Sequence, residues 1–159
     1  MKKNIFMSLF VTFIMVISCF AMPASAMSDD NDDYVLSTVY EYFEDGSYSV
    51  TTITEYSNLR ANTKTGSKTY TYKNSNGETQ WTYKVTGTFS YTGSSSSCTA
   101  VSDSYTISND NWHMSSHSCS KSGNTAYGTV TMKYKILGIT TNTISKDLSL
   151  TCSATGTLS

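Results

Sequence analysis

The sequence predicts an all-β fold, an immunoglobulin-like antiparallel β-sandwich of about 7–9 strands, with a small β-barrel as the alternative. In residues 80–93, apolar and aromatic side chains fill the odd positions and mostly hydroxyl side chains fill the even ones. Residues 126–136 alternate in the same way. Successive side chains of a strand point to opposite faces, so both segments predict strands with one buried face. Charged residues make up only 14% of the chain, while threonine and tyrosine, which favour strands, are abundant.

Residues 1–26 have the features of a secretory signal peptide, which we expect to be helical. Two lysines precede an apolar run over residues 5–17, and small residues end at Ala26. This pattern predicts cleavage after Ala26 and a secreted protein. Two alternatives stay open. The run is about long enough to serve as an uncleaved membrane anchor, and the four residues ending at Cys19 resemble a lipobox, in which Cys19 would carry a lipid.

A single β-sandwich domain is expected over residues 34–159, after an acidic and flexible leader over residues 27–33. Clusters of asparagine, glycine, serine and aspartate separate the strands. We expect strands at residues 34–43, 48–56, 69–73, 80–93, 98–107, 126–136 and 145–155, with a loop over 57–68 and weak alternation over 112–119.

Individual residues on these strands carry further expectations. Val35, Val39 and Phe43 mark a possible inward face of the first strand, whose weak alternation indicates an edge position. Gly87 lies in the middle of the long aromatic strand, which indicates a bulge or a close approach of another backbone. Cys98 is expected to share a face with Ala100, opposite Val101.

Three cysteines remain once the signal peptide is removed: Cys98, Cys119 and Cys152. An oxidising compartment favours a disulfide, and three cysteines permit one internal bond. We favour Cys98–Cys152, because Cys152 lies on the apolar face of the last strand and Cys119 lies among polar residues. A Cys98–Cys119 bond and three free thiols stay open. A free Cys119 would be open to intermolecular pairing.

No catalytic residue, metal site or cofactor is predicted. The acidic residues are scattered and lie mostly in turns, whereas glycoside hydrolysis needs two carboxylates at a fixed separation. No serine lies in a nucleophile elbow. His117 and Cys119 would share one face of a strand, but a tetrahedral metal site needs more ligands than the two supply.

Charge excludes some partners. Without residues 1–26 the chain has 9 basic and 12 acidic residues, and no basic face that would indicate nucleic acid. We expect contact with a membrane only through the signal peptide or a lipid on Cys19, because no polybasic segment is present.

Tyrosines are the feature that most invites a functional interpretation. Exposed rings on a β face can stack on sugars or contact a protein. The possible binding face consists of Tyr40, Tyr42, Tyr70 and Tyr72, although tyrosine is also simply a good strand residue. Three functions therefore stay open: a non-catalytic protein that binds an extracellular glycan, the cell wall or another protein; a self-associating envelope protein; and a small extracellular hydrolase.

Three segments in the second half of the chain resemble a known group of proteins. They are residues 81–93 (WTYKVTGTFSYTG), 122–127 (SGNTAY) and 148–159 (LSLTCSATGTLS). Together they resemble small secreted proteins of Gram-positive bacteria that form an uncharacterised domain family. The resemblance covers roughly residues 78–159, implies no function, and also favours Cys98 and Cys152 as the structural pair.

Overall fold

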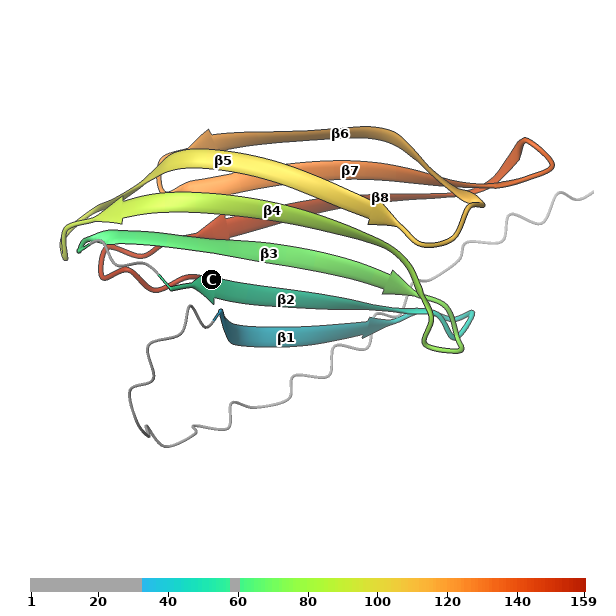
Figure 1. Cartoon of the computed structure of the whole chain (residues 1–159), viewed down its shortest axis with the longest axis horizontal. Coiled ribbons are helices and arrows are strands. Elements are labelled where there is room, and N and C mark those ends of the chain that lie inside the picture. Colours follow the sequence, from blue (N-terminus) through green and yellow to red (C-terminus); the bar gives the residue numbers. More distant parts are fainter. Residues whose placement is uncertain (1–32, 58–60) are drawn as a thin grey trace, which may run out of the picture.

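The computed structural model describes residues 33–57 and 61–159, and within them it confirms an all-β sandwich. Eight antiparallel strands form two sheets that face each other (Figure 1). The first sheet contains β1 (Tyr34–Tyr42), β2 (Tyr48–Tyr56), β3 (Thr63–Lys73), β4 (Thr79–Tyr91) and β5 (Ser96–Ile107). The second contains β6 (Trp112–Ser122), β7 (Thr125–Ile136) and β8 (Ile139–Thr151). The expected signal peptide, its cleavage site at Ala26 and Cys19 lie outside the described residues.

Both sheets are meanders, in which each strand pairs with its neighbour in the chain. The connection from β5 to β6 carries the chain from the first sheet to the second. The sheets are not closed into a barrel, so the barrel alternative is wrong. The likeness to an immunoglobulin domain is one of architecture, since those domains use Greek-key connections.

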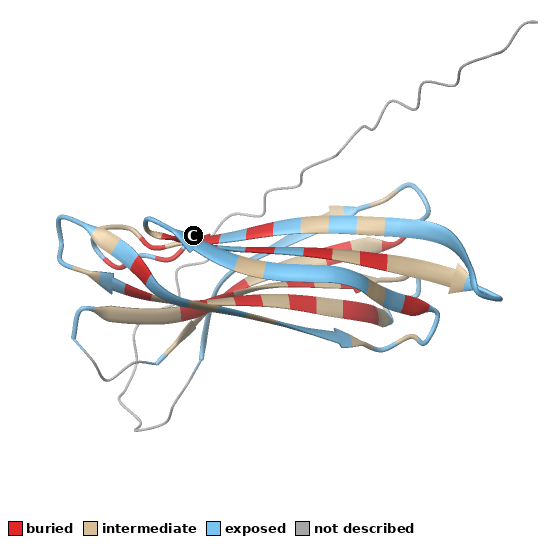
Figure 2. Cartoon of the chain, turned by 90° about the horizontal axis from the view of Figure 1, so that it is seen from above, coloured by how far each residue is buried: buried red, intermediate tan, exposed pale blue. Residues whose placement is uncertain are grey.

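The core is built on the aromatic face of β4. Trp81, Tyr83, Val85 and Phe89 have no exposed surface, which confirms the strand with one apolar face expected over residues 80–93. The second sheet covers them with Ala126, Val130, Met132, Leu148 and Leu150. Buried positions alternate with more exposed ones along the strands (Figure 2). Each large apolar side chain buried in this way contributes roughly 1.5–3 kcal/mol to folding.

Two glycines allow the sheets to approach closely at the centre of the core. A Cβ added to Gly128 of β7 would overlap Cγ2 of Val85 and lie 2.7 Å from Oη of Tyr83. A Cβ added to Gly87 of β4 would lie 2.6 Å from Cζ of Phe89. The atoms nearest to Gly87 belong to the side chains of Phe89 on the same strand and of Ala126 on β7, so side-chain packing rather than an approaching backbone explains this glycine.

β1 is an uncovered edge strand, as its weak alternation indicated. Val35 and Val39 are 63% and 52% exposed, so the expected inward face of this strand is wrong except at Phe43, which packs against the core. The second sheet has three strands against five, and it packs over β3, β4 and β5. β1 and β2 therefore extend beyond its border.

Three strand boundaries differ by four residues or more from those expected: the start of β3 and both ends of β8, which stops at Thr151 rather than at residue 155. β3 begins at Thr63, inside the segment 57–68 that its polar composition marked as a loop, because these residues pair with both β2 and β4. β8 begins at Ile139 rather than at residue 145, because it continues the β7–β8 hairpin to its tip.

Cys98 also faces the side opposite to the one expected. On β4, Thr88 pairs with Ala100 and the next residue, Phe89, pairs with Cys98. Thr99 of β5 therefore has no partner on β4 and forms a β-bulge. This bulge reverses the alternation, so Cys98 is buried while Ala100 is exposed.

The contact at Gly128 leads to a prediction about stability. Gly128→Ala would force Val85 and Tyr83 to move, and we expect it to lower the free energy of unfolding by about 1–3 kcal/mol, the usual cost of overpacking a core. Urea denaturation followed by tryptophan fluorescence would measure the change. Ser116→Ala, at an exposed position of the neighbouring strand β6, is the control and should have a much smaller effect. Equal stability of Gly128→Ala and wild type would contradict the close packing.

Candidate functional site

The four tyrosines of the possible binding face lie on two different surfaces. Tyr40 and Tyr42 are exposed on the outer side of the first sheet, where Tyr42 lies 5.5 Å from Tyr48 between ring centroids. Tyr70 and Tyr72 are buried on the inner side, against Trp81. The four therefore do not form one continuous face, and the role of either pair in binding stays a prediction.

A groove opens where the second sheet fails to cover the first. We call it the inter-sheet groove. It has two adjoining parts, of about 480 and 310 Å³, which share Asp45, Ser47, Tyr72 and Asn142. One wall is the β1–β2 turn, the floor is β3, and the opposite wall is residues 142–146 of β8. These volumes fall in the usual range for small-molecule sites.

The groove combines aromatic rings with carboxylate and amide groups. Rings are contributed by Phe43, Tyr70, Tyr72, Trp112 and Tyr134. The polar groups are Glu44, Asp45, Asn74, Gln80, Asn109, Asn142 and Lys146. Several of these are held by hydrogen bonds: Tyr72 Oη donates to Ser47 Oγ at 3.0 Å, and Ser47 Oγ donates to Asp45 Oδ1 at 2.5 Å. The turn between β1 and β2 is thereby tied to the floor of the groove.

Tyr70 places an unpaired polar atom at the floor of the groove. The side chain is only 1% exposed, and its Oη has no hydrogen-bond partner among the described residues. Burial raises the pKa of Tyr70 to about 12, and the nearby Ser49 hydroxyl opposes this shift without reaching hydrogen-bond geometry. Lys146 Nζ lies 5.1 Å from the centre of the Tyr70 ring and 2.9 Å from Glu41 Oε2, so it closes this end of the groove.

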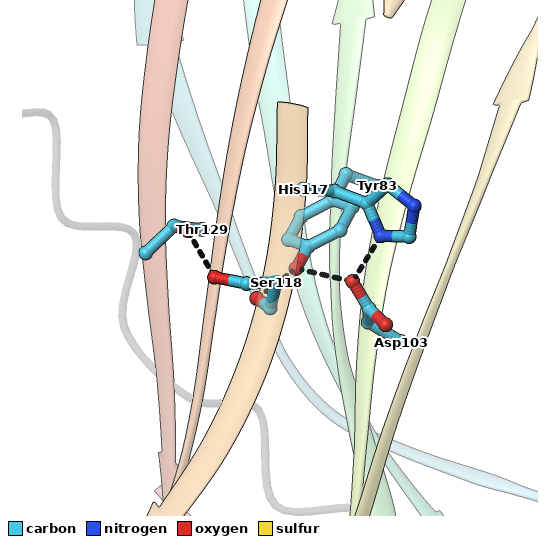
Figure 3. A network of polar contacts seen from close by, with 5 residues as sticks. All are labelled: Tyr83, Asp103, His117, Ser118 and Thr129. Atoms are coloured by element: carbon cyan, nitrogen blue, oxygen red, sulfur yellow. Dashed lines mark hydrogen bonds and ion pairs between the residues drawn. The ribbon is translucent and has the colours of Figure 1, made fainter. Parts of the chain in front are cut away.

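A second group of polar side chains meets where β5 and β6 run side by side. Asp103 Oδ2 accepts hydrogen bonds from Tyr83 Oη at 2.9 Å and from His117 Nδ1 at 2.7 Å (Figure 3). Tyr83 Oη also lies 3.1 Å from the carbonyl oxygen of Ser118. The ring of His117 packs against Tyr105, with 5.2 Å between centroids. We call Tyr83, Asp103 and His117 the seam cluster.

The electrostatics of the seam cluster favour a structural role. Burial alone would raise the pKa of Asp103, but the hydrogen bonds from His117 and Tyr83 oppose this effect, and the pKa lies below its ordinary value. Burial and the Asp103 carboxylate raise the pKa of the Cys119 thiol. Cys119 is therefore kept protonated, whereas a nucleophilic cysteine needs a lowered pKa.

The sequence placed His117 and Cys119 on one face of a strand, and the structure agrees, since both point inward from β6. It did not indicate Asp103 or Tyr83 as their partners, because those residues come from other strands. His113 pairs with Lys133 on the outer side of the sheet. No group of three or more potential metal ligands lies together in residues 33–57 and 61–159.

All three described cysteines are free thiols in this structure. The backbone N–H of Cys98 donates to the carbonyl of Gly123 at 2.8 Å, and that of Cys152 donates to the carbonyl of Asn124 at 3.0 Å. The two buried cysteines therefore flank the same turn. Burial raises the pKa of Cys152, and Cys98 is among the neighbouring groups that raise it further. Cys119 lies on β6, away from this turn, so a Cys98–Cys119 bond is disfavoured.

Comparisons of the chain with protein-family models, with curated proteins and with solved structures found no match. The resemblance to small secreted proteins of Gram-positive bacteria therefore stays a prediction from the three motifs. Within the described part of the chain, no helix has the length and apolar character needed to span a membrane.

The seam cluster predicts an acid-sensitive component of stability. The pKa of Asp103 is lower in the folded protein than the value of 3.8 in the unfolded chain. The ionised carboxylate therefore stabilises the fold fully above pH 3.8, and this stabilisation is lost as the pH falls through the lower pKa of the folded state. Asp103→Asn should reduce the free energy of unfolding by about 1–3 kcal/mol at neutral pH and remove this acid-sensitive part.

Urea titrations of wild type and Asp103→Asn, from neutral pH to below the ordinary carboxyl range, would measure this difference. Asp147→Asn makes the same chemical change at an exposed position of β8 and serves as the control. Parallel pH profiles for wild type and Asp103→Asn would show that the cluster does not couple to folding.

Proposed function

We propose that this chain is a secreted, non-catalytic β-sandwich protein that binds an extracellular glycan in the inter-sheet groove. Secretion is supported by the basic start, apolar run and small-residue cleavage site of residues 1–26. The observation that carries the binding function is the groove itself, in which aromatic rings lie beside amide and carboxylate groups.

A sugar presents both an apolar ring face and a rim of hydroxyl groups, and the groove offers a partner for each. Phe43 is only partly buried, so it supplies an apolar surface on which a sugar ring can pack. Asp45 accepts hydrogen bonds, and Asn142 both donates and accepts them.

Binding without hydrolysis fits the distribution of charges in the groove. Glu44 and Asp45 are adjacent residues of one turn, whereas a glycosidase places its two carboxylates on opposite sides of the bond that breaks. The opposite wall, residues 142–146, contains Lys146 and no acid. A small extracellular hydrolase is therefore the function that the groove supports least.

Self-association is a second candidate, and the uncovered β1 favours it. This strand exposes Tyr34, Val35, Leu36 and Val39, and its outer edge has no strand partner among the described residues. Such an edge can pair with the same strand of another copy. The alternative route through Cys119 has less support, because burial and the Asp103 charge raise the pKa of that thiol and so disfavour the reactive thiolate. A concentration-dependent change of mass that Val39→Lys abolishes would favour this candidate.

Secretion and the state of the cysteines are tested by one measurement. In an oxidising compartment, the Cys98 and Cys152 thiols would each lose a proton, and the pair would give two electrons to the disulfide of an oxidoreductase, which becomes a dithiol. We expect the mass of the exported chain to correspond to a start at Met27 and to one internal disulfide, with Cys119 alone open to alkylation. A lipidated start at Cys19 would indicate the lipoprotein, and three alkylated cysteines would contradict the disulfide.

Glycan binding is tested by replacing a polar group of the groove. We expect the protein to bind at least one of chitin, cellulose and purified peptidoglycan in a sedimentation assay. Asn142 lies at an exposed position of β8. Asn142→Ala should weaken binding about tenfold, because it removes one hydrogen bond that contributes about 1.4 kcal/mol to binding.

Asn76→Ala is the matched control, because Asn76 is exposed and lies outside both parts of the groove. Its affinity should equal that of wild type. Absence of binding to all three polysaccharides, or equal affinities of Asn142→Ala and wild type, would contradict the proposal.

A further inference from the structure

The β7–β8 hairpin ends in a turn that holds apolar side chains in solvent. Ile136 pairs with Ile139, and Leu137 and Gly138 form the turn between them. Ile136, Leu137 and Ile139 are 51%, 97% and 69% exposed. Both turn residues have positive φ, 51° and 81°, as in a type I′ turn, which favours Asn-Gly. A bulky apolar residue thus occupies a position where the backbone alone favours asparagine.

The hairpin tip also extends beyond the rest of the molecule. Figure 1 shows the orange-red β7–β8 hairpin reaching past the other turns at the same end of the sandwich. The tip, residues 136–139, would therefore meet an extended surface before the body of the protein did.

The flanks of the tip are basic. Residues 126–146 contain three lysines and no acidic residue. Lys133 and Lys135 lie on β7 close to the tip. The backbone N–H of Lys135 donates to the carbonyl of Asn111, at 2.8 Å, in the turn between β5 and β6, and this turn contributes one acid, Asp110. Lys146 is paired with Glu41, and Glu44 and Asp45 lie across the groove from residues 142–146, so the positive charge beside the tip is that of Lys133 and Lys135.

We propose that the tip of the β7–β8 hairpin docks into the surface of a lipid bilayer with anionic headgroups. Leu137 and Ile139 enter the acyl boundary, and Lys133 and Lys135 contact the headgroup phosphates. Apolar residues combined with neighbouring lysines are the features that hold a protein segment at such an interface. A second copy of the chain fits this surface less well, because two basic tips would face each other.

Leu137→Asn separates docking from folding, because it creates the favoured Asn-Gly turn while removing the most exposed apolar side chain. We expect wild type to sediment with vesicles of phosphatidylcholine containing about 30% phosphatidylglycerol, and less so in high salt. Leu137→Asn should bind at least about tenfold more weakly, with an unchanged or higher unfolding midpoint. Tyr127→Asn, which removes an exposed ring at the far end of β7, is the control and should bind like wild type.

The exported chain, with the start at Met27 proposed above, is used throughout, so that the apolar segment 5–17 does not contribute to vesicle binding. A second readout reports on the tip alone. Trp81 and Trp112, the two tryptophans of the chain, are buried. In Leu137→Trp the new indole is therefore the exposed one, and brominated lipids should quench it. The indole of Tyr127→Trp should not be quenched.

Three results would overturn the proposal. The first is equal sedimentation of Leu137→Asn and wild type with anionic vesicles. The second is equal quenching at positions 137 and 127. The third is a concentration-dependent oligomer that Leu137→Asn abolishes, without vesicle binding by wild type, which would assign the tip to a contact between copies of the chain.

Discussion

The contact of Gly128 with Val85 and Tyr83 is the constraint on which the interior depends. Because Gly128 has no side chain, β7 lies directly against β4, and the second sheet covers the aromatic face of that strand. The same contact directs Tyr83 Oη toward β5 and β6, where it reaches Asp103 and the carbonyl of Ser118. Core packing and the seam cluster are therefore one arrangement. A side chain at residue 128 would disturb both.

The groove is a consequence of unequal sheets. Five strands face three, so the inner side of β1 and β2 extends beyond the cover that β8 provides. The Glu41–Lys146 ion pair joins β1 to β8 across this gap, and the Tyr72–Ser47 hydrogen bond holds the β1–β2 turn against the floor. Surface ion pairs of this kind add little stability, so their main effect is to define the shape of the opening. No inserted loop is needed to make the cavity.

The parts of the fold that follow from local pattern were predicted, and the parts that depend on distant contacts were not. Residues 80–93 and 126–136 alternate strictly, and β4 and β7 follow them closely. The polar residues at the start of β3 carry no alternation and predict a loop, and only the pairing with β2 and β4 makes this segment a strand. Asp103 was missed for a related reason: its partners lie 20 and 14 residues away in sequence.

The meander has a consequence for how the chain folds. Every paired strand closes a short loop, so the entropy lost in forming each sheet is small. The long-range step is the docking of β7 and β8 onto β4. A chain that leaves a ribosome or a translocation channel N-terminus first completes its five-stranded sheet early. That sheet then exposes Trp81 and Phe89 to water until residues 125–151 emerge. During this interval the exposed aromatic face is the surface that a chaperone would bind.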